Sequence, residues 1–180
     1  MRSRIEVSGL VAAPDWAVWA LIRGFDLGLH PDVASAEVEG GLRRMVMRDG
    51  SEVVERLVFR SDTERRIIYR LEGSAYQAEI RLLAMGAATR VIWSANPAAD
   101  SETFVRNVFQ RGIAALNDRL SLRNQQFGDL AAITAGAGEP VLFLHGIGGT
   151  KENWRDQLWA VAGFAQGIAV DLTGYGESAV

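Results

Sequence analysis

The sequence contains no cysteine, only two histidines and no long apolar run. The lack of cysteine excludes disulfide bonds and cysteine-ligated metals. Two distant histidines with scattered acids do not form a metal-ligand set, so we expect no metal and no cofactor. No stretch approaches the ~20 apolar residues of a membrane span. The N-terminus also lacks the apolar core of a signal peptide. We therefore expect a cytoplasmic protein without a membrane span.

An excess of charge of one sign is also missing. Residues 1–124 carry a net charge of +1 and residues 125–180 a net charge of −4. Neither part has the basic surplus that a nucleic-acid surface needs. Arginines alternate with acids along the predicted strands, a pattern typical of solvated faces. We therefore expect no nucleic-acid partner.

The longest helical pattern runs from Asp100 to Arg123. Its apolar residues form two adjacent rows, Phe104, Val108, Gly112 and Leu116 in one and Val105, Phe109, Ile113, Leu116 and Leu120 in the other. Two adjacent rows make a wide apolar stripe that must be buried against another element. Pro97 prevents an earlier start of this helix.

The segments before this helix read as strands, apart from a short helix near residues 13–22. The expected strands cover 5–11, 33–39, 42–47, 51–60, 65–72, 76–82 and 89–95. Several of them alternate apolar and charged residues, which predicts an antiparallel sheet with one face in water. The fold class expected for this part is α+β, with a curved sheet that grips the long helix.

The alternation places Glu55 and Phe59 on the inner face of the sheet, together with Tyr69, Ile80 and Trp93. An inward carboxylate is costly unless it is solvated or paired. Glu55 is therefore a candidate ligand-binding residue with Tyr69 as a neighbour. The alternative is a structural pair with Arg44, or water at the strand end.

Residues 3–122 resemble the SRPBCC superfamily, also called the START or birch-pollen-allergen fold, and most of all its polyketide cyclase/dehydrase branch. The resemblance is carried by VAAPDWAVWALIRGFD, HPDV, DGSEVVERL, TRVIWSA and the terminal helix, in this order. Leu29 stands where many relatives have an aromatic residue before His-Pro. The resemblance implies a cavity between sheet and helix for a small hydrophobic molecule such as a lipid or polyketide. The candidate ligand-binding residues are His30, Glu55, Phe59, Tyr69, Ile80 and Trp93, with His30 as an anchor or a base and Phe59 and Trp93 as cavity wall or core.

The sequence changes in character after Arg123. An apolar run, Val141 to Leu144, precedes His145-Gly146-Ile147-Gly148-Gly149, and a second apolar run follows at residues 168–171. A strand, a glycine-rich loop, a helix and a strand predict a parallel βαβ unit. The loop does not match the P-loop, because the spacing to Lys151 is wrong and no hydroxyl residue follows it, and it does not match the dinucleotide pattern, which needs a glycine at the position of Lys151.

The segments EPVLFLHGIGGTKENW and IAVDLTGYGES resemble the start of an α/β-hydrolase, over about residues 128–180. The resemblance implies an oxyanion loop at His145, Gly146, Ile147, Gly148 and Gly149, with the Ile147 N–H as a donor and His145 in a structural role. The nucleophile, acid and histidine of that family come later in chain order. We therefore expect no catalytic residue in this chain and reject Ser178 as a nucleophile.

The expected organisation is a ligand-binding domain at 1–123, a linker with a short strand at 124–139, and a truncated hydrolase segment at 140–180. The favoured function is binding of a small hydrophobic ligand, fused to an inactive hydrolase piece. One alternative is an ester or lactone hydrolase in the full-length protein, with the first domain binding its substrate. The other is a polyketide cyclase or dehydratase in which Glu55 acts as acid or base.

Overall fold

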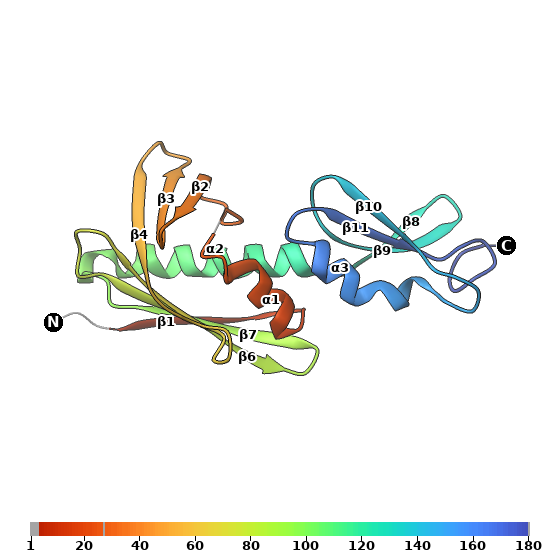
Figure 1. Cartoon of the computed structure of the whole chain (residues 1–180), viewed down its shortest axis with the longest axis horizontal. Helices are drawn as coiled ribbons and strands as arrows, with labels where there is room; N and C mark the ends of the chain where they lie inside the picture. Colours follow the sequence, from red (N-terminus) through yellow and green to blue (C-terminus); the bar gives the residue numbers. More distant parts are fainter. Residues whose placement is uncertain (1–3, 27, 180) are drawn as a thin grey trace. The chain divides into compact units, whose positions relative to one another are not determined.

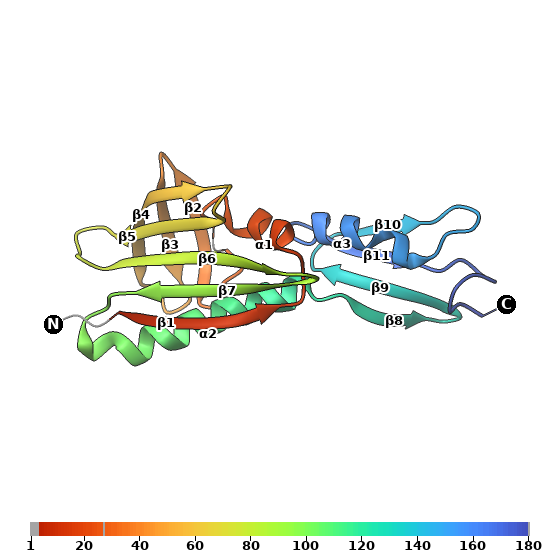
Figure 2. The same ribbon diagram turned by 90° about the horizontal axis from the view of Figure 1, so that it is seen from below.

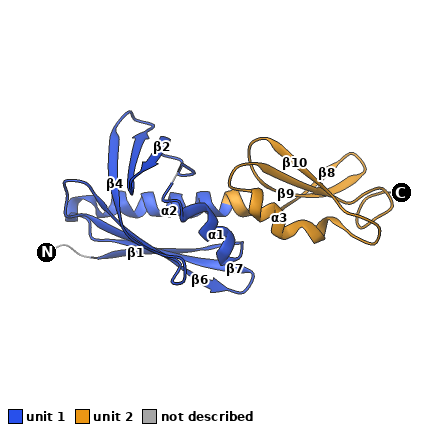
Figure 3. Ribbon diagram, in the orientation of Figure 1, with its two compact units in different colours: residues 1–117 blue, residues 118–180 orange. Residues whose placement is uncertain are grey.

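The computed structural model describes residues 4–26 and 28–179, which form two compact units. Unit 1 comprises residues 1–117 and unit 2 residues 118–180 (Figure 3). The division falls inside the long helix, whereas the sequence suggested a boundary after residue 123. Each unit is described by itself below.

Unit 1 is built on a seven-stranded antiparallel sheet with the strand order β1-β7-β6-β5-β4-β3-β2. The strands are β1 (Ile5–Val11), β2 (Val33–Glu39), β3 (Leu42–Met47), β4 (Glu52–Ser61), β5 (Arg66–Leu71), β6 (Gln77–Met85) and β7 (Ala88–Ala95). The first strand pairs with the last, and every other neighbour is joined by a hairpin. The expected antiparallel sheet is confirmed, and Figure 2 shows β1, β7, β6 and β5 side by side.

The helix α2 (Glu102–Leu120) follows a short 3-10 turn, η1 (Ala99–Ser101), and runs along one face of the sheet (Figure 1). One of its two predicted rows is buried, namely Val105, Phe109, Ile113, Leu116 and Leu120. A Cβ on Gly112 would come within 2.5 Å of the Trp93 ring. The missing side chain therefore lets α2 approach the sheet closely.

The helix α1 (Asp15–Ile22) packs on β6 and β7 and buries Trp19. The indole N–H of Trp19 donates to Asp62 Oδ1 at 2.7 Å. Shortly after α1 in the sequence, the chain turns at Phe25, a buried residue with a φ of 63°. This left-handed conformation is unusual for a residue with a side chain.

One prediction for the inner face of the sheet is wrong. Phe59 was expected to point inward, but its side chain is 38% exposed and lies under the guanidinium of Arg66. The pairing of β4 with β5 shifts between Leu57 and Phe59, which marks a β-bulge. An extra residue in one strand reverses the alternation beyond it, and this reversal takes Phe59 out of the interior.

Unit 2 contains a four-stranded sheet with the order β10-β11-β9-β8. The strands are β8 (Arg123–Phe127), β9 (Leu130–Gly136), β10 (Pro140–Leu144) and β11 (Gln166–Val170), and η2 (Lys151–Trp154) and α3 (Arg155–Val161) connect β10 to β11. β10 and β11 are parallel, whereas β9 pairs antiparallel with both β8 and β11. The predicted strand, helical segment and strand are therefore present in the expected order.

The stretch expected to be a linker with a short strand, residues 124–139, is mostly a hairpin, and β9 is the strand that was expected. β8 and β9 pair from Arg123↔Thr134 to Phe127↔Leu130, so α2 ends three residues earlier than the pattern suggested. The small residues that resembled a linker are buried in β9 from Ala131 to Ala135. Their size fits a crowded site, because a Cβ on Gly136 would lie 2.2 Å from the Ala165 carbonyl oxygen.

No helix in the described part of the chain is long and apolar enough to cross a membrane.

Candidate functional site

A cavity of about 670 Å³ opens in unit 1 between the strands β3 to β5 and the helix α2. Its apolar wall consists of Met45, Met47, Val53, Leu71, Pro97, Ala98, Phe104, Val105 and Val108. Its polar lining consists of Asp32, Arg48, Asp49, Ser51, Glu55, Ser74, Tyr76, Ser101 and Arg111. A mostly apolar wall with a few placed polar groups is typical of small-molecule sites, and this volume suits a drug-sized molecule.

Glu55 lies in this cavity, as its inward orientation predicted, and it is only 7% exposed. Its partner is Arg43, which stands directly opposite on β3 and is 1% exposed. Both Nε, at 3.1 Å, and Nη2 of Arg43 donate to Oε2 of Glu55. The predicted alternative of a pair with Arg44 was wrong by one residue, because β3 turns Arg44 outward.

Arg43 has further contacts with a backbone carbonyl and with two aromatic rings. Its Nη1 donates to the Phe25 carbonyl oxygen at 3.0 Å, and its guanidinium lies 4.1 Å from the Phe25 ring centroid and 5.2 Å from that of Tyr69. Cation–π contacts of this kind favour arginine over lysine. The strained turn at Phe25 thus supplies both a carbonyl and a ring to the buried guanidinium.

Tyr69, Trp93 and Ile80 are buried in the sheet and lie outside the cavity lining. Trp93 donates from Nε1 to the Tyr69 hydroxyl at 2.8 Å and stacks on Phe109 of α2 at 4.6 Å. Burial, and then the charge of Glu55, raise the pKa of Tyr69 well above its ordinary value. These residues build the core behind the site, and Phe59 lies on the outside of the sheet.

His30 is an anchor in this structure. Its Nδ1 accepts from the Asp32 N–H at 3.2 Å, which leaves the proton on Nε2 to donate to the Val108 carbonyl at 2.9 Å. The ring is 6% exposed and does not line the cavity. His30 therefore fastens the loop before β2 to the middle of α2.

Several cavity residues were not recognised from the sequence. Tyr76 was not among the predicted site residues, yet it lines the cavity. Arg111 was not predicted as a site residue either, yet it lines the cavity and forms an ion pair with Asp32. The apolar stripe of α2 carried the signal, because Phe104, Val105 and Val108 near its start line the cavity, while its later residues are buried in the core.

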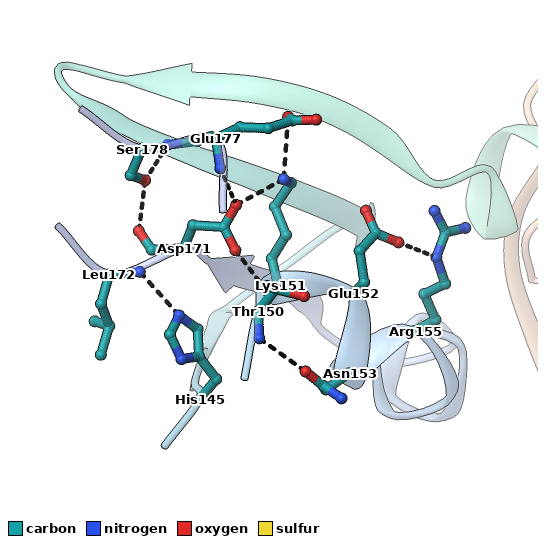
Figure 4. Close-up of polar contacts among 11 residues, drawn as sticks. His145, Thr150, Lys151, Glu152, Asn153, Arg155, Asp171, Leu172, Glu177 and Ser178 are labelled. Carbon is teal, nitrogen blue, oxygen red and sulfur yellow. Dashed lines mark hydrogen bonds and ion pairs between the residues drawn. The ribbon is translucent and has the colours of Figure 1, made fainter. Parts of the chain in front are cut away.

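The glycine-rich loop of unit 2 is organised around hydrogen bonds to its flanks (Figure 4). Nε2 of His145 accepts from the Leu172 N–H at 3.0 Å, so Nδ1 carries the proton and donates to the Gly146 carbonyl at 2.8 Å. His145 thus ties the loop to the end of β11. Ile147 is 99% exposed.

A buried ion pair lies beside this loop (Figure 4). Lys151 Nζ donates to Asp171 Oδ2 at 2.8 Å and to Glu177 Oε2 at 3.1 Å. Asp171 also accepts from the backbone N–H groups of Lys151 and Glu177, at 2.7 and 2.9 Å. Gly176 is required here, because a Cβ would lie 2.2 Å from Asp171 Oδ2.

Ser178 is part of the same turn. Its hydroxyl donates to the Asp171 carbonyl at 2.6 Å and accepts from the Ala131 N–H at 2.9 Å. Both contacts are to backbone atoms, and no base lies among them. Within the described residues, no group of three His, Asp or Glu side chains is arranged to hold a metal ion.

Comparison with known proteins assigns the first part of the chain. Residues 2–123 match the family model described as polyketide cyclase/dehydrase and lipid transport. No curated protein matches the chain in sequence.

Similar solved structures include an uncharacterized protein from Bacillus thuringiensis, with 24% identity and a TM-score of 0.59, covering 64% of this chain and 96% of that one. The protein XoxI from Bacillus cereus has 23% identity and a TM-score of 0.60, with coverages of 64% and 93%. The Zhui aromatase/cyclase from Streptomyces sp. R1128 has 19% identity and a TM-score of 0.50, with coverages of 65% and 90%. At these identities the likeness shows a shared fold.

Proposed function

The chain belongs to the polyketide cyclase/dehydrase and lipid transport family, and from this we propose that its cavity binds a small hydrophobic ligand of lipid or polyketide type. The observation that carries the proposal is the cavity of about 670 Å³, whose wall is mostly apolar and in which two of the three lining carboxylates are paired with arginines. Glu55 is balanced by Arg43, and Asp32 by Arg111. At Glu55 and at Asp32 a neutral apolar molecule therefore lies beside a balanced ion pair and not beside a lone charge.

The test is a fluorescence titration that measures the affinity of the full chain for a neutral apolar probe, N-phenyl-1-naphthylamine. In Val105→Trp an indole enters the cavity from α2, so probe affinity should fall at least tenfold, about 1.4 kcal/mol. Val38→Trp is the matched control, because Val38 is exposed on β2 and outside the lining. Failure of the folded wild-type protein to bind apolar probes, or equal binding by both variants, would refute the proposal.

A cyclase or dehydratase is the second candidate function, and the position of Glu55 in the cavity favours it. A carboxylate beside a bound β-ketone could exchange a proton with it. Conversion of such a ketone by the wild-type protein, lost in Glu55→Gln while binding persists, would support catalysis. Binding without conversion would leave the protein a carrier.

We further propose that residues 128–180 follow the N-terminal part of the α/β-hydrolase fold without supplying a nucleophile. The fold is supported by the parallel pairing of β10 with β11, which α3 separates in the chain. The lack of a nucleophile is supported by the hydroxyl of Ser178, which is hydrogen-bonded to the backbone. We expect no turnover of 4-nitrophenyl acetate above the buffer rate, and no change in Ser178→Ala. Turnover that disappears in Ser178→Ala would overturn this assignment.

A further inference from the structure

One carboxylate oxygen of Glu55 accepts hydrogen bonds from the protein, and the other is available to a ligand. Both hydrogen bonds from Arg43 end on Oε2. In the described part of the chain, no donor is directed at Oε1, and Glu55 lines the cavity. An ionised carboxylate is a pure acceptor, so Oε1 presents an acceptor site to whatever fills the cavity.

Arg43 determines whether a cationic or a neutral donor of the ligand fits this acceptor. Its charge already balances that of Glu55, and the guanidinium is also fixed by the Phe25 carbonyl. A cationic ligand would add an uncompensated charge to a largely apolar site, which is costly. A neutral hydroxyl group, by contrast, offers the single donor that Oε1 lacks.

Tyr76 lines the same cavity and lies near enough to Glu55 to interact with its charge. Burial, and next the negative charge of Glu55, raise the pKa of Tyr76, so its phenol stays neutral. Its hydroxyl has no hydrogen-bond partner among the described residues, so it can donate to or accept from a bound molecule. Two interacting polar groups in a mostly apolar cavity give a ligand a defined orientation.

We propose that the cavity selects neutral, hydroxyl-bearing apolar molecules, whose hydroxyl donates to Oε1 of Glu55 with Tyr76 beside it. This inference rests on the proposed ligand-binding function and adds the group that is recognised. The remainder of the ligand lies against Met45, Leu71 and Val108.

The experiment compares 2-naphthol with 2-methoxynaphthalene as competitors of N-phenyl-1-naphthylamine. The two share one skeleton, but only the naphthol can donate. Apolar transfer alone favours the methoxy compound, which buries an extra methyl group. We expect the wild-type protein to bind 2-naphthol at least tenfold more tightly, which is the opposite order.

Glu55→Gln should abolish or invert this preference. Arg43 will take the amide oxygen, which turns the NH₂ group and not an acceptor toward the cavity. Glu52→Gln is the matched control, since this residue is exposed on the same strand and outside the lining. It should keep the wild-type preference.

Each outcome decides one point. Equal affinities, or tighter binding of the methoxy compound by the wild-type protein, overturn the inference and leave the proposed function standing. A naphthol preference that persists in Glu55→Gln overturns the role of Glu55. If the probe binds and neither compound displaces it, the inference is overturned, whereas the proposed function itself fails if the probe does not bind. The wild-type comparison decides the inference even if Glu55→Gln does not fold.

Discussion

Among single residues, Asp171 shows most clearly how a buried charge can have a net stabilising effect. Burial alone would raise its pKa, but hydrogen bonds from Glu177 and Lys151 outweigh this effect and lower it below 3.8. Burial likewise opposes the charge of Lys151, and its bonds to Asp171 and Glu177 raise its pKa above 10.5. Both groups are therefore charged between about pH 4 and pH 10, and in this range both ions stabilise unit 2.

The acid limit gives a prediction for Asp171→Asn. Because the folded state lowers the pKa of Asp171, its contribution is complete above about pH 4 and is lost as the pH falls through the folded pKa. At pH 7 the variant leaves Lys151 buried without its main partner, and unit 2 should lose about 3 kcal/mol of unfolding free energy. Urea unfolding of β9 and β11, followed by their backbone amide NMR signals at pH 7 and pH 3, measures both effects.

The variant should also lose less stability between pH 7 and pH 3 than the wild-type protein does. Asp156→Asn serves as the control, because Asp156 is exposed on α3 and should change the unfolding free energy by less than about 0.5 kcal/mol. An Asp171→Asn protein as stable as the wild type at pH 7 would show that the ion pair contributes nothing to unit 2.

The partner of Glu55 shows what residue patterns cannot decide. Glu55 was correctly placed inside, because β4 has one clearly charged face. In β3, however, Leu42, Arg44 and Val46 alternate with Arg43, Met45 and Met47, so each face holds both arginine and apolar residues. The register with β4 places Arg43 opposite Glu55. Only the paired structure identifies which arginine is buried.

At the level of elements, long periodic segments were predictable and short irregular ones were not. The strands of unit 1 and the helix α2 follow from alternation and from the two apolar rows. The bulge at Leu57 to Phe59 leaves no mark in the pattern of β4, so the outward turn of Phe59 could not be foreseen. Of the hairpin of β8 and β9, only one short strand was predicted, because alanine and glycine occur equally in a linker and in a crowded strand.

The candidate site combines both kinds of element. The wall from β3, β4 and β5 was partly predictable from its inward side chains. The contribution of α2 was not, because its apolar stripe has two roles: residues near its start face the cavity and later ones fill the core. Gly112 lies in the later part, where the helix rests directly on Trp93.

In the molecule as a whole, the cavity and the glycine-rich loop belong to separate compact units. All residues that line the cavity fall between Asp32 and Arg111, inside unit 1. The turn around Asp171 lies inside unit 2. A change confined to that turn should therefore destabilise unit 2 without altering ligand binding.

Gly176→Ala tests this separation in the full chain. Gly176 has a φ of 52°, and the added Cβ would also meet Asp171 Oδ2, so unit 2 should lose about 2 kcal/mol of unfolding free energy. Gly174→Ala is the control, because its φ is 79° but the space around it is open, and it should cost about 1 kcal/mol. Amide hydrogen exchange in β9 and β11 reports the loss, and N-phenyl-1-naphthylamine titration reports the cavity.

We expect probe affinity to stay within twofold of the wild-type value in both glycine variants. If affinity in Gly176→Ala instead falls tenfold together with the exchange protection of β9 and β11, the folding of unit 2 supports the cavity through α2, the one element that both units share. Unchanged affinity with lost protection would establish that the ligand-binding part keeps its function when the second unit opens.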